Sequence, residues 1–421
     1  MRKHRPDFVI ALIVLGLMAA SLIIVYAIGP RVAQALNTQY GTSYSDTYFL
    51  VRHAITVVLS IGALVAGYFL KYDFLAKYAK KMLIASIILC LLVTILGKLG
   101  VDALVTCDKG ACRSLRIPGI GMGFMPSELF KVSVLFYVSW LIRDRKEKKE
   151  LNTQRFFIPL AAVMLAVVVL LGWWESDFGS TVVIIFMIFA MMFAGGVELI
   201  NLLKIIGVAA AVFLILIIAT PYRMQRILSY SGDEGSDTYH IENALISMGT
   251  GGVMGVGLGN SIQSTGYLPE ALSDSIFAII CETWGFLGAT LIILAITILL
   301  WKILNVSQRI KDPEQRLFSV GVFAWIVSHV IINIGGMTNL LPMKGITLPF
   351  LSYGGTSMLF VAFAVGIVLQ ISGWTSRKAI EEENEDTSSR RGQRRTRYSS
   401  RSGRSWNLES ASARKDRILD W

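Results

Sequence analysis

The chain has 421 residues, of which 54% are hydrophobic and only 16% are charged, and its formal net charge is +11. This balance is unlike that of a soluble globular protein. Four histidines and four cysteines, with no CxxC pair and no His/Cys cluster, argue against a metal centre built from those side chains.

Uninterrupted apolar runs recur along the chain, each long enough to cross a hydrocarbon core of ~30 Å. Two of them, 127–142 and 157–173, sit at the short end of the spanning range. The sequence therefore predicts an all-α polytopic membrane protein with ten transmembrane helices in one bundle. The predicted spans are 8–28, 50–70, 82–100, 127–142, 157–173, 179–196, 203–220, 276–301, 317–338 and 352–373.

The first run, 8–28, has a basic start and a small-x-small match at Ala33-Gln34-Ala35, both of which are also found in cleaved signal peptides. Its apolar stretch is longer than the ~7–15 residues of a signal h-region. We therefore expect a retained first helix.

Basic residues separate the loops into two groups. If ten helices alternate, the N-terminus and the loops 71–81, 143–155 and 302–316 share one side, and they are richer in Lys and Arg than the loops of the other side. The positive-inside rule then places both termini in the cytoplasm. Most of the net charge is this topology signal and does not indicate nucleic-acid binding.

The segment 376–421 begins acidic and becomes rich in Arg and Ser. Such a composition cannot bury a core, so we expect a transmembrane domain over 1–375 followed by a disordered basic cytoplasmic tail. The basic half is suited to anionic lipid headgroups or a cytoplasmic partner. A solvated tail without a ligand explains it equally well.

The longest outer loop, 221–275, lies between predicted helices 7 and 8. Residues 239–261 are apolar and Gly-rich, which favours a re-entrant or interfacial segment over disorder. In the outer loop 101–125, Cys107 and Cys112 are close enough in sequence to form a small disulfide in an oxidising exterior, and a pair of free thiols is the alternative.

Ionisable residues concentrate on the outer side. Asp274 stands two residues before the span that begins at Ile276, and a carboxylate so near the bilayer indicates a functional site. Cations at this level suit a pyrophosphate, and a lone carboxylate suits a general base. The other outer candidates are Glu270, Glu282, Glu128, Lys131, Asp177, Arg113, Arg223, Arg226 and Lys344.

Structural roles compete with these interpretations. Asp274 is well suited to be a helix N-cap, and Lys131 with Glu128 forms an i, i+3 pair that neutralises itself. Glu282 has two structural alternatives, an ion pair with Arg52 or burial as a neutral acid.

Two long segments carry a resemblance to a known family: GVGLGNSIQSTGYLPEALSDSIFA at 255–278 and LLPMKGITLPFLSYGGTSML at 340–359, supported by PSELFK at 126–131 and SDFGST at 176–181. The chain resembles the SEDS family (shape, elongation, division and sporulation proteins) of bacterial peptidoglycan polymerases over nearly all of 1–375. Within it the chain is most similar to the cell-division branch, FtsW. It departs from the usual His-Thr-Asp at Leu272-Ser273-Asp274, and from Gln-Pro-Asp at Glu175-Ser176-Asp177.

The resemblance implies a peptidoglycan glycosyltransferase that polymerises lipid II into glycan strands at the outer face of the bacterial cytoplasmic membrane, in septal synthesis during division. It implies Asp274 as the catalytic base. It also implies a class B penicillin-binding protein and other division proteins as partners, beside membrane lipids and the nascent strand. A divalent cation, Mg²⁺ or Mn²⁺, would assist the departing pyrophosphate, although no ligand set is evident. Expected substrate-binding residues are Lys131, Arg113, Arg223, Lys344, Glu270, Glu128, Asp177, Ser352 and Tyr353.

Two other functions compete with polymerisation. Ten helices and a broken segment at 240–262 would suit a flippase for a lipid-linked precursor, but the carboxylates cluster at one side and no inverted repeat is visible. A non-catalytic division scaffold would tolerate the loss of Asp274.

Overall fold

The computed structural model describes residues 6–101, 104–108, 111–116, 123–218, 236–341 and 345–374, all within one compact unit, Lys3–Thr375. Helices account for most of this part of the chain. They are α1 (Phe8–Tyr40), α2 (Tyr48–Phe69), α3 (Tyr72–Lys77), α4 (Ala79–Lys98), α5 (Pro126–Glu147), α6 (Gln154–Ala166), the π-helix η1 (Val167–Trp174), α7 (Phe178–Gly195), α8 (Leu199–Ile218), α10 (Ser236–Thr250), the short 3₁₀ turn η2 (Gln263–Thr265), α11 (Ile276–Arg309), α12 (Pro313–Met337) and α13 (Gly355–Ser372).

Eight helices in the described part of the chain are long and apolar enough to cross a membrane. They are α1, α2, α4, α6 with its π-helical extension, α7, α11, α12 and α13. The prediction of an all-α polytopic membrane protein is therefore confirmed, while the count of ten is not. The other two predicted spans correspond to α5, whose ends carry charges, and to α8, whose side chains are described only as far as Ala209.

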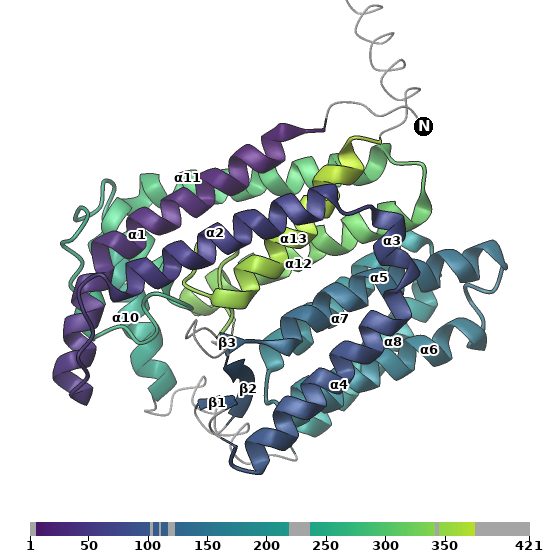
Figure 1. Ribbon diagram of the computed structural model, residues 1–421, viewed down its shortest axis with the longest axis horizontal. Coiled ribbons are helices and arrows are strands. Elements are labelled where there is room, and N and C mark those ends of the chain that lie inside the picture. Colours follow the sequence, from purple (N-terminus) through teal and green to yellow (C-terminus); the bar gives the residue numbers. More distant parts are fainter. Residues whose placement is uncertain are drawn as a thin grey trace, which may run out of the picture. The chain divides into compact units, whose positions relative to one another are not determined.

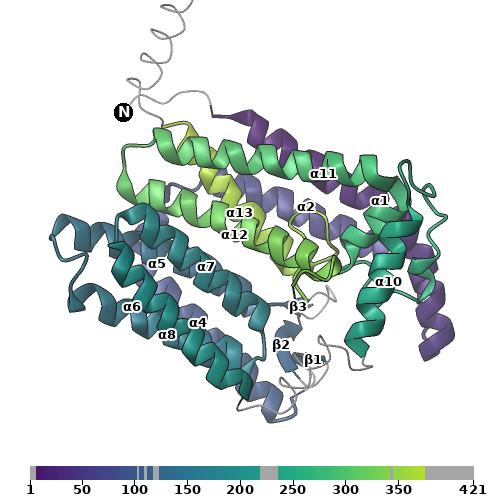
Figure 2. The ribbon, with the colours of Figure 1, turned by 180° about the vertical axis from the view of Figure 1, so that it is seen from behind.

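The helices form two groups, with α1, α2, α11 and α13 on one side and α4 to α8 on the other (Figures 1 and 2). Helix α12 contacts α11 and α13 in the first group and α5 and α7 in the second. Large, fully buried aromatic side chains lie where α12 packs between the two groups. The ring centroids of Phe136 on α5 and Phe318 on α12 are 4.7 Å apart, and Trp325 of α12 is 0% exposed. Because α12 is in contact with both groups, a residue on it can hold elements of both.

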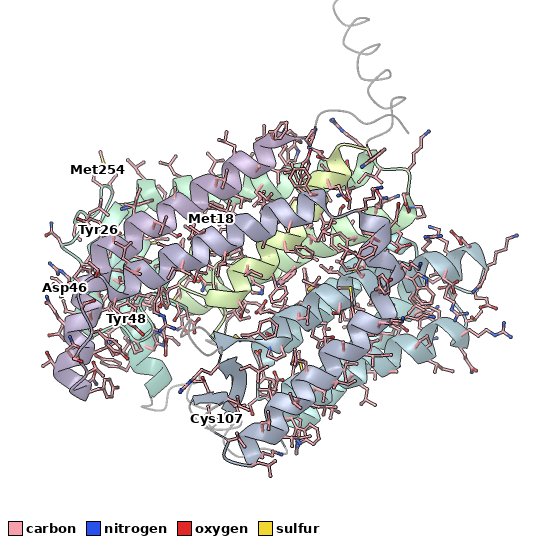
Figure 3. All side chains as sticks on the ribbon, in the orientation of Figure 1. Met18, Tyr26, Asp46, Tyr48, Cys107 and Met254 are labelled. Atoms are coloured by element: carbon pink, nitrogen blue, oxygen red, sulfur yellow. A yellow bond between two sulfur atoms is a disulfide. The ribbon has the colours of Figure 1, made fainter. Side chains whose placement is uncertain are left out.

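A small antiparallel sheet lies at the end of the bundle where α4 ends and α5 begins (Figure 1). Its strands are β1 (Val105–Asp108), β2 (Ala111–Arg116) and β3 (Gly123–Phe124), in the order β1-β2-β3. A disulfide joins Cys107 of β1, labelled in Figure 3, to Cys112 of β2, so the first of the two alternatives for these cysteines is confirmed. The hydropathy pattern did not predict the sheet itself.

The long outer loop contains helix α10, which packs against α11, and a Gly-rich segment that fills a break in α11. Gly285 interrupts α11 with φ 69° and ψ −168°. The amides of Val256 and Gly257 donate to the carbonyls of Glu282 and Thr283, and those of Phe286 and Leu287 donate to the 251–257 segment in return. The broken backbone is thus satisfied by protein, as irregular backbone at membrane depth requires.

Close approach of the two backbones explains the glycines at this break. A Cβ on Gly285 would lie 2.3 Å from the nitrogen of Gly255, and one on Gly255 would lie 2.3 Å from the carbonyl oxygen of Thr283. Both residues also have a positive φ, which favours glycine. The re-entrant or interfacial segment predicted at 239–261 is therefore a helix followed by a backbone insertion, whose outermost residue Met254 is 76% exposed (Figure 3).

Candidate active site

Asp274 lies in the turn that leads into α11. Helix α11 begins at Ile276 and its N-cap residue is Ser275, so the alternative of Asp274 as the N-cap is wrong. The side chain of Asp274 is half-buried and faces the loop after α12, since a Cβ built on Gly345 would lie 2.8 Å from Oδ2 of Asp274. The two segments that carry the family resemblance therefore meet at this carboxylate.

Hydrogen bonds to the backbone fix the Asp274 turn on several sides. The Asn333 amide of α12 donates both to the carbonyl of Asp274 and to that of Ile346, each at 2.7 Å. The amide of Tyr353 donates to the carbonyl of Leu272 at 2.8 Å. These bonds are accepted by main-chain carbonyls, so they hold the turn that carries Asp274 in place.

Helix α12 presents three polar side chains at intervals of four residues, Trp325, His329 and Asn333, and all are buried. Trp325 Nε1 donates to His329 Nε2 at 3.1 Å, so the ring hydrogen is on Nδ1, which donates to the carbonyl of Thr347 at 3.0 Å. This stripe of three side chains thus holds the 345–353 loop through hydrogen bonds to its backbone carbonyls. Sequence reasoning missed it, although polar residues at i, i+4 and i+8 within an apolar helix were a usable signal.

Lys131 and Glu128 form a buried ion pair on α5, with Nζ 2.7 Å from Oε1 and exposed side-chain fractions of 1% and 6%. Lys131 Nζ also lies 5.7 Å from the centroid of the Trp325 ring. The other oxygen of Glu128 has no hydrogen-bond partner among the described residues. The pair therefore touches the α12 stripe, and in this arrangement the charge of Lys131 is already matched.

Arg113 and Asp177 hold the loop between η1 and α7. Arg113 donates from Nε to the carbonyl of Glu175 and from Nη2 to that of Ser176, at 2.9 and 2.8 Å. Asp177 is the N-cap of α7, and its carboxylate accepts from the amide of Ser180 at 3.0 Å. Both candidate binding residues thus have local partners in the structure.

Glu175, in the same loop, is buried, and neither carboxyl oxygen has a well-formed hydrogen bond among the described residues. Burial, and after it the nearby Asp177 carboxylate, raise the pKa of Glu175 to about 8, with Cys90 and Arg113 offsetting part of the effect. In the sequence, Glu175 is notable only because the family usually has a glutamine at this position.

Glu175→Gln is expected to flatten the dependence of stability on pH. The pKa of Glu175 is raised from 4.5 to about 8 in the folded protein. The protonated side chain therefore contributes to the free energy of unfolding, and this contribution is fully present below pH 4.5 and is lost as the pH rises to 8. The slope in that window is about 1.4 kcal/mol per pH unit at most. Melting of the detergent-solubilised protein between pH 5 and 9 should show a higher midpoint for Glu175→Gln at pH 8. Parallel curves for variant and parent would contradict this, and Glu147→Gln, at an exposed carboxyl, is the control.

The remaining described candidates surround the Asp274 turn. Ser352 is buried and its Oγ accepts from the amide of Leu348 at 2.7 Å, which closes the turn before Tyr353. The Tyr353 ring is half-buried against His53 and Phe49. Glu270 is exposed, has φ 50°, and its carboxylate accepts from Ser273 Oγ at 3.0 Å.

Glu282 is a structural centre that the sequence left ambiguous. Its buried carboxylate accepts from Ser261 Oγ at 2.7 Å, from the amide of Ile262 at 2.8 Å and from Ser247 Oγ at 3.2 Å. Within the described residues it forms no ion pair with Arg52, so that alternative is wrong. Together with the amide of Gln263 at 3.3 Å, these donors around one carboxylate hold α10, α11 and the 255–265 loop together.

Three predicted cations, Arg223, Arg226 and Lys344, lie outside the described residues. No group of three His, Cys, Asp or Glu side chains in the described part of the chain could hold a metal ion. A divalent cation at a phosphate site needs only one or two carboxylates besides the phosphate oxygens, so the expected Mg²⁺ or Mn²⁺ stays a prediction.

A family model described as "Cell cycle protein", FTSW_RODA_SPOVE, matches residues 8–377. The chain belongs to this family. It is 30% identical to stage V sporulation protein E of Bacillus subtilis strain 168, over 89% of this chain and 99% of that protein. It is 33% identical to the probable peptidoglycan glycosyltransferase FtsW of Idiomarina loihiensis, over 77% of this chain and 78% of that protein. The resemblance to the SEDS family is thereby confirmed.

Solved structures share the fold of this FtsW/RodA/SpoVE family member. One comes from a study of the structural coordination of polymerization and crosslinking by a peptidoglycan synthase complex, with TM-score 0.68, 21% identity, and coverage of 88% of this chain and 99% of that one. Another is the rod shape determining protein RodA of Thermus thermophilus, with TM-score 0.60, 21% identity, and coverage of 87% and 96%. At this identity the likeness establishes the fold.

Proposed function

We propose that this chain is a peptidoglycan glycosyltransferase that polymerises lipid II, with Asp274 as its general base. The observation that carries the proposal is the half-buried carboxylate of Asp274 at the meeting point of two family segments, in a turn whose main-chain carbonyls accept from the side-chain amide of Asn333 and the backbone amide of Tyr353. The names of the relatives, which include probable peptidoglycan glycosyltransferases, support the reaction class.

The proposed reaction is an inverting glycosyl transfer. A carboxylate oxygen of Asp274 takes the proton from the 4-hydroxyl of the acceptor sugar. At the same time the hydroxyl oxygen of the sugar attacks the anomeric carbon of the lipid-linked strand. The new glycosidic bond forms as the bond to the undecaprenyl pyrophosphate breaks, and the electron pair leaves with the phosphate. A pyrophosphate is a good leaving group, so the second carboxylic acid that glycosidases use is not required.

Cations near the leaving group would stabilise its developing charge. Lys344, which immediately precedes Gly345 in the chain, and Arg223 are the proposed phosphate-binding residues. Arg113 and Lys131 have protein partners within the described structure, so phosphate binding by either one requires exchange of those partners.

Location and partners complete the proposal. We place the reaction at the outer face of the cytoplasmic membrane, with both termini and the basic tail 376–421 in the cytoplasm, and in septal synthesis with a class B penicillin-binding protein. A solved structure of a peptidoglycan synthase complex among the fold relatives supports a crosslinking partner. Localisation of a fluorescent fusion to midcell supports division, and uniform sidewall labelling contradicts it.

The purified full chain in liposomes is expected to convert lipid II into glycan polymer that a muramidase digests. Gel electrophoresis of fluorescent lipid II products measures this directly, with addition of the penicillin-binding partner as a second condition. Transfer of a lipid II analogue across the liposome membrane, with no polymer under either condition, would replace this proposal with the flippase.

A further inference from the structure

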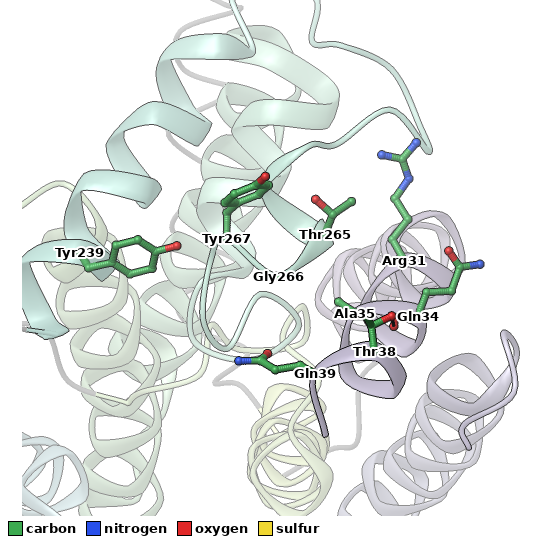
Figure 4. A pocket seen from close by; sticks show the side chains of 9 residues that line it. All are labelled: Arg31, Gln34, Ala35, Thr38, Gln39, Tyr239, Thr265, Gly266 and Tyr267. Atoms are coloured by element: carbon green, nitrogen blue, oxygen red, sulfur yellow. Dashed lines mark hydrogen bonds between the residues drawn. The ribbon is translucent and has the colours of Figure 1, made fainter. Parts of the chain in front are cut away.

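A pocket of about 530 Å³ with a mixed polar and apolar lining opens between the C-terminal part of α1, the start of α10 and the loop before Asp274 (Figure 4). Its wall includes Arg31, Gln34 and Gln39 from α1, Tyr239 from α10, and Thr265 and Tyr267 from the loop. The reaction proposed above gives no role to these residues.

The pocket lies at the end of a helix that is longer than a membrane span requires. Helix α1 has 33 residues and at 1.5 Å per residue is about 50 Å long, whereas a membrane core requires ~30 Å. The part that follows Pro30 carries the pocket residues, of which Gln34 and Gln39 are exposed. A water-soluble group can therefore reach the pocket from the outer side.

The pocket adjoins the Asp274 turn through direct contacts. Tyr239 is followed by His240, whose Nε2 lies 2.7 Å from Oγ of Ser275, the residue after Asp274. Ser275 Oγ also donates to the carbonyl of Pro269 at 2.9 Å, which closes the turn that starts at Tyr267. One hydrogen-bonded turn thus carries a pocket wall at one end and the proposed base at the other.

The lining has the chemistry of a saccharide site. Tyr239 and Tyr267 are 49% and 54% exposed, so their rings are open to the apolar face of a sugar while their hydroxyls remain available to hydrogen-bond (Figure 4). The glutamine amides supply both donors and acceptors for hydroxyl and N-acetyl groups. Such a mix of aromatic and a few polar groups, at this volume, is typical of small-ligand pockets.

Arg31 gives the pocket its charge. No acidic residue among those that the structure describes lines it, and one guanidinium N–H of Arg31 donates to the carbonyl of Ser261 at 2.7 Å. A guanidinium has five N–H donors, so most of them stay available to a ligand. The pocket therefore favours a sugar that carries a carboxylate.

We propose that this pocket binds a saccharide unit of the peptidoglycan strand, an amino sugar with its acidic peptide stem, next to the unit that reacts at Asp274. This rests on the proposed function for the identity of the strand. Binding at the pocket would hold the strand in register with the base, since both belong to the same turn.

Binding of a soluble, lipid-free disaccharide pentapeptide to the purified full chain tests the pocket without requiring turnover. In saturation-transfer NMR titrations, Tyr239→Ala with Tyr267→Ala is expected to raise the Kd about tenfold, because both aromatic contacts with the apolar face of the sugar are lost. Tyr40→Ala is the matched control. Tyr40 is 68% exposed at the C-terminal end of α1, near the pocket, but does not line it. Thermal melting verifies that each variant is folded.

An unchanged Kd in the double variant overturns the proposal, and so does equal affinity for the free pentapeptide, which lacks the sugars. The outcome is independent of polymerisation. If the parent binds the fragment through these tyrosines but makes no polymer, the pocket stands and the proposed function fails. If it makes polymer while the double variant binds normally, the function stands and the pocket assignment fails.

Discussion

Asp274→Asn is expected to reduce the rate of lipid II polymerisation by about 10²–10⁴-fold, the usual contribution of a positioned general base. The asparagine has nearly the same shape but cannot accept a proton at neutral pH. The bonds that position the turn involve the main chain of Asp274 and Leu272, so they persist in the variant. Initial rates with fluorescent lipid II measure the loss, and melting of both proteins should agree within a few degrees.

Asp46→Asn is the matched control for this substitution. Asp46 is an exposed aspartate in the loop between α1 and α2 (Figure 3). Its polymerisation rate should equal that of the parent. An Asp274→Asn protein with parental activity and normal folding would remove Asp274 from the mechanism and, with it, the assignment of the base.

The fold class was predictable from the sequence because it depends on a strong local signal, whereas the role of Asp274 stays a prediction. Long apolar runs predicted the spans, and the position of Asp274 two residues before one of them drew attention to the turn. The small sheet with Cys107 and Cys112 was not predictable, because its strands are short and contain no alternating pattern. The break at Gly285 was also missed, since a single glycine in an apolar run does not reveal that another backbone inserts there.

The roles of charged residues were the least predictable part, because a sequence shows charges but not their partners. Asp177 is an N-cap and Glu282 is surrounded by hydroxyl and amide donors, and both facts depend on contacts distant in the chain or on exact helix starts. Asn333 was overlooked because a lone amide in an apolar helix looks unremarkable. Its two hydrogen bonds to separate loops make it a positioning residue for Asp274.

Lys131→Met is expected to destabilise the protein by about 3–5 kcal/mol, because it leaves the Glu128 carboxylate buried without its counter-ion. The two side chains are 1% and 6% exposed and 2.7 Å apart, so water cannot replace the lost ammonium group. Lys148→Met is the control: Lys148 forms a pair of the same length with Asp144 but is 56% exposed, and such surface pairs contribute at most about 1 kcal/mol. Thermal and denaturant unfolding in detergent measure both variants.

The double variant Lys131→Met with Glu128→Gln separates a structural pair from a phosphate-binding lysine. Removal of both charges takes away the uncompensated carboxylate, so most of the lost stability should return. If the pair is only structural, the KM for lipid II of the double variant should match that of the parent. A restored melting point with a KM raised tenfold or more would assign Lys131 to the substrate, because the loss of binding would then persist in a correctly folded protein.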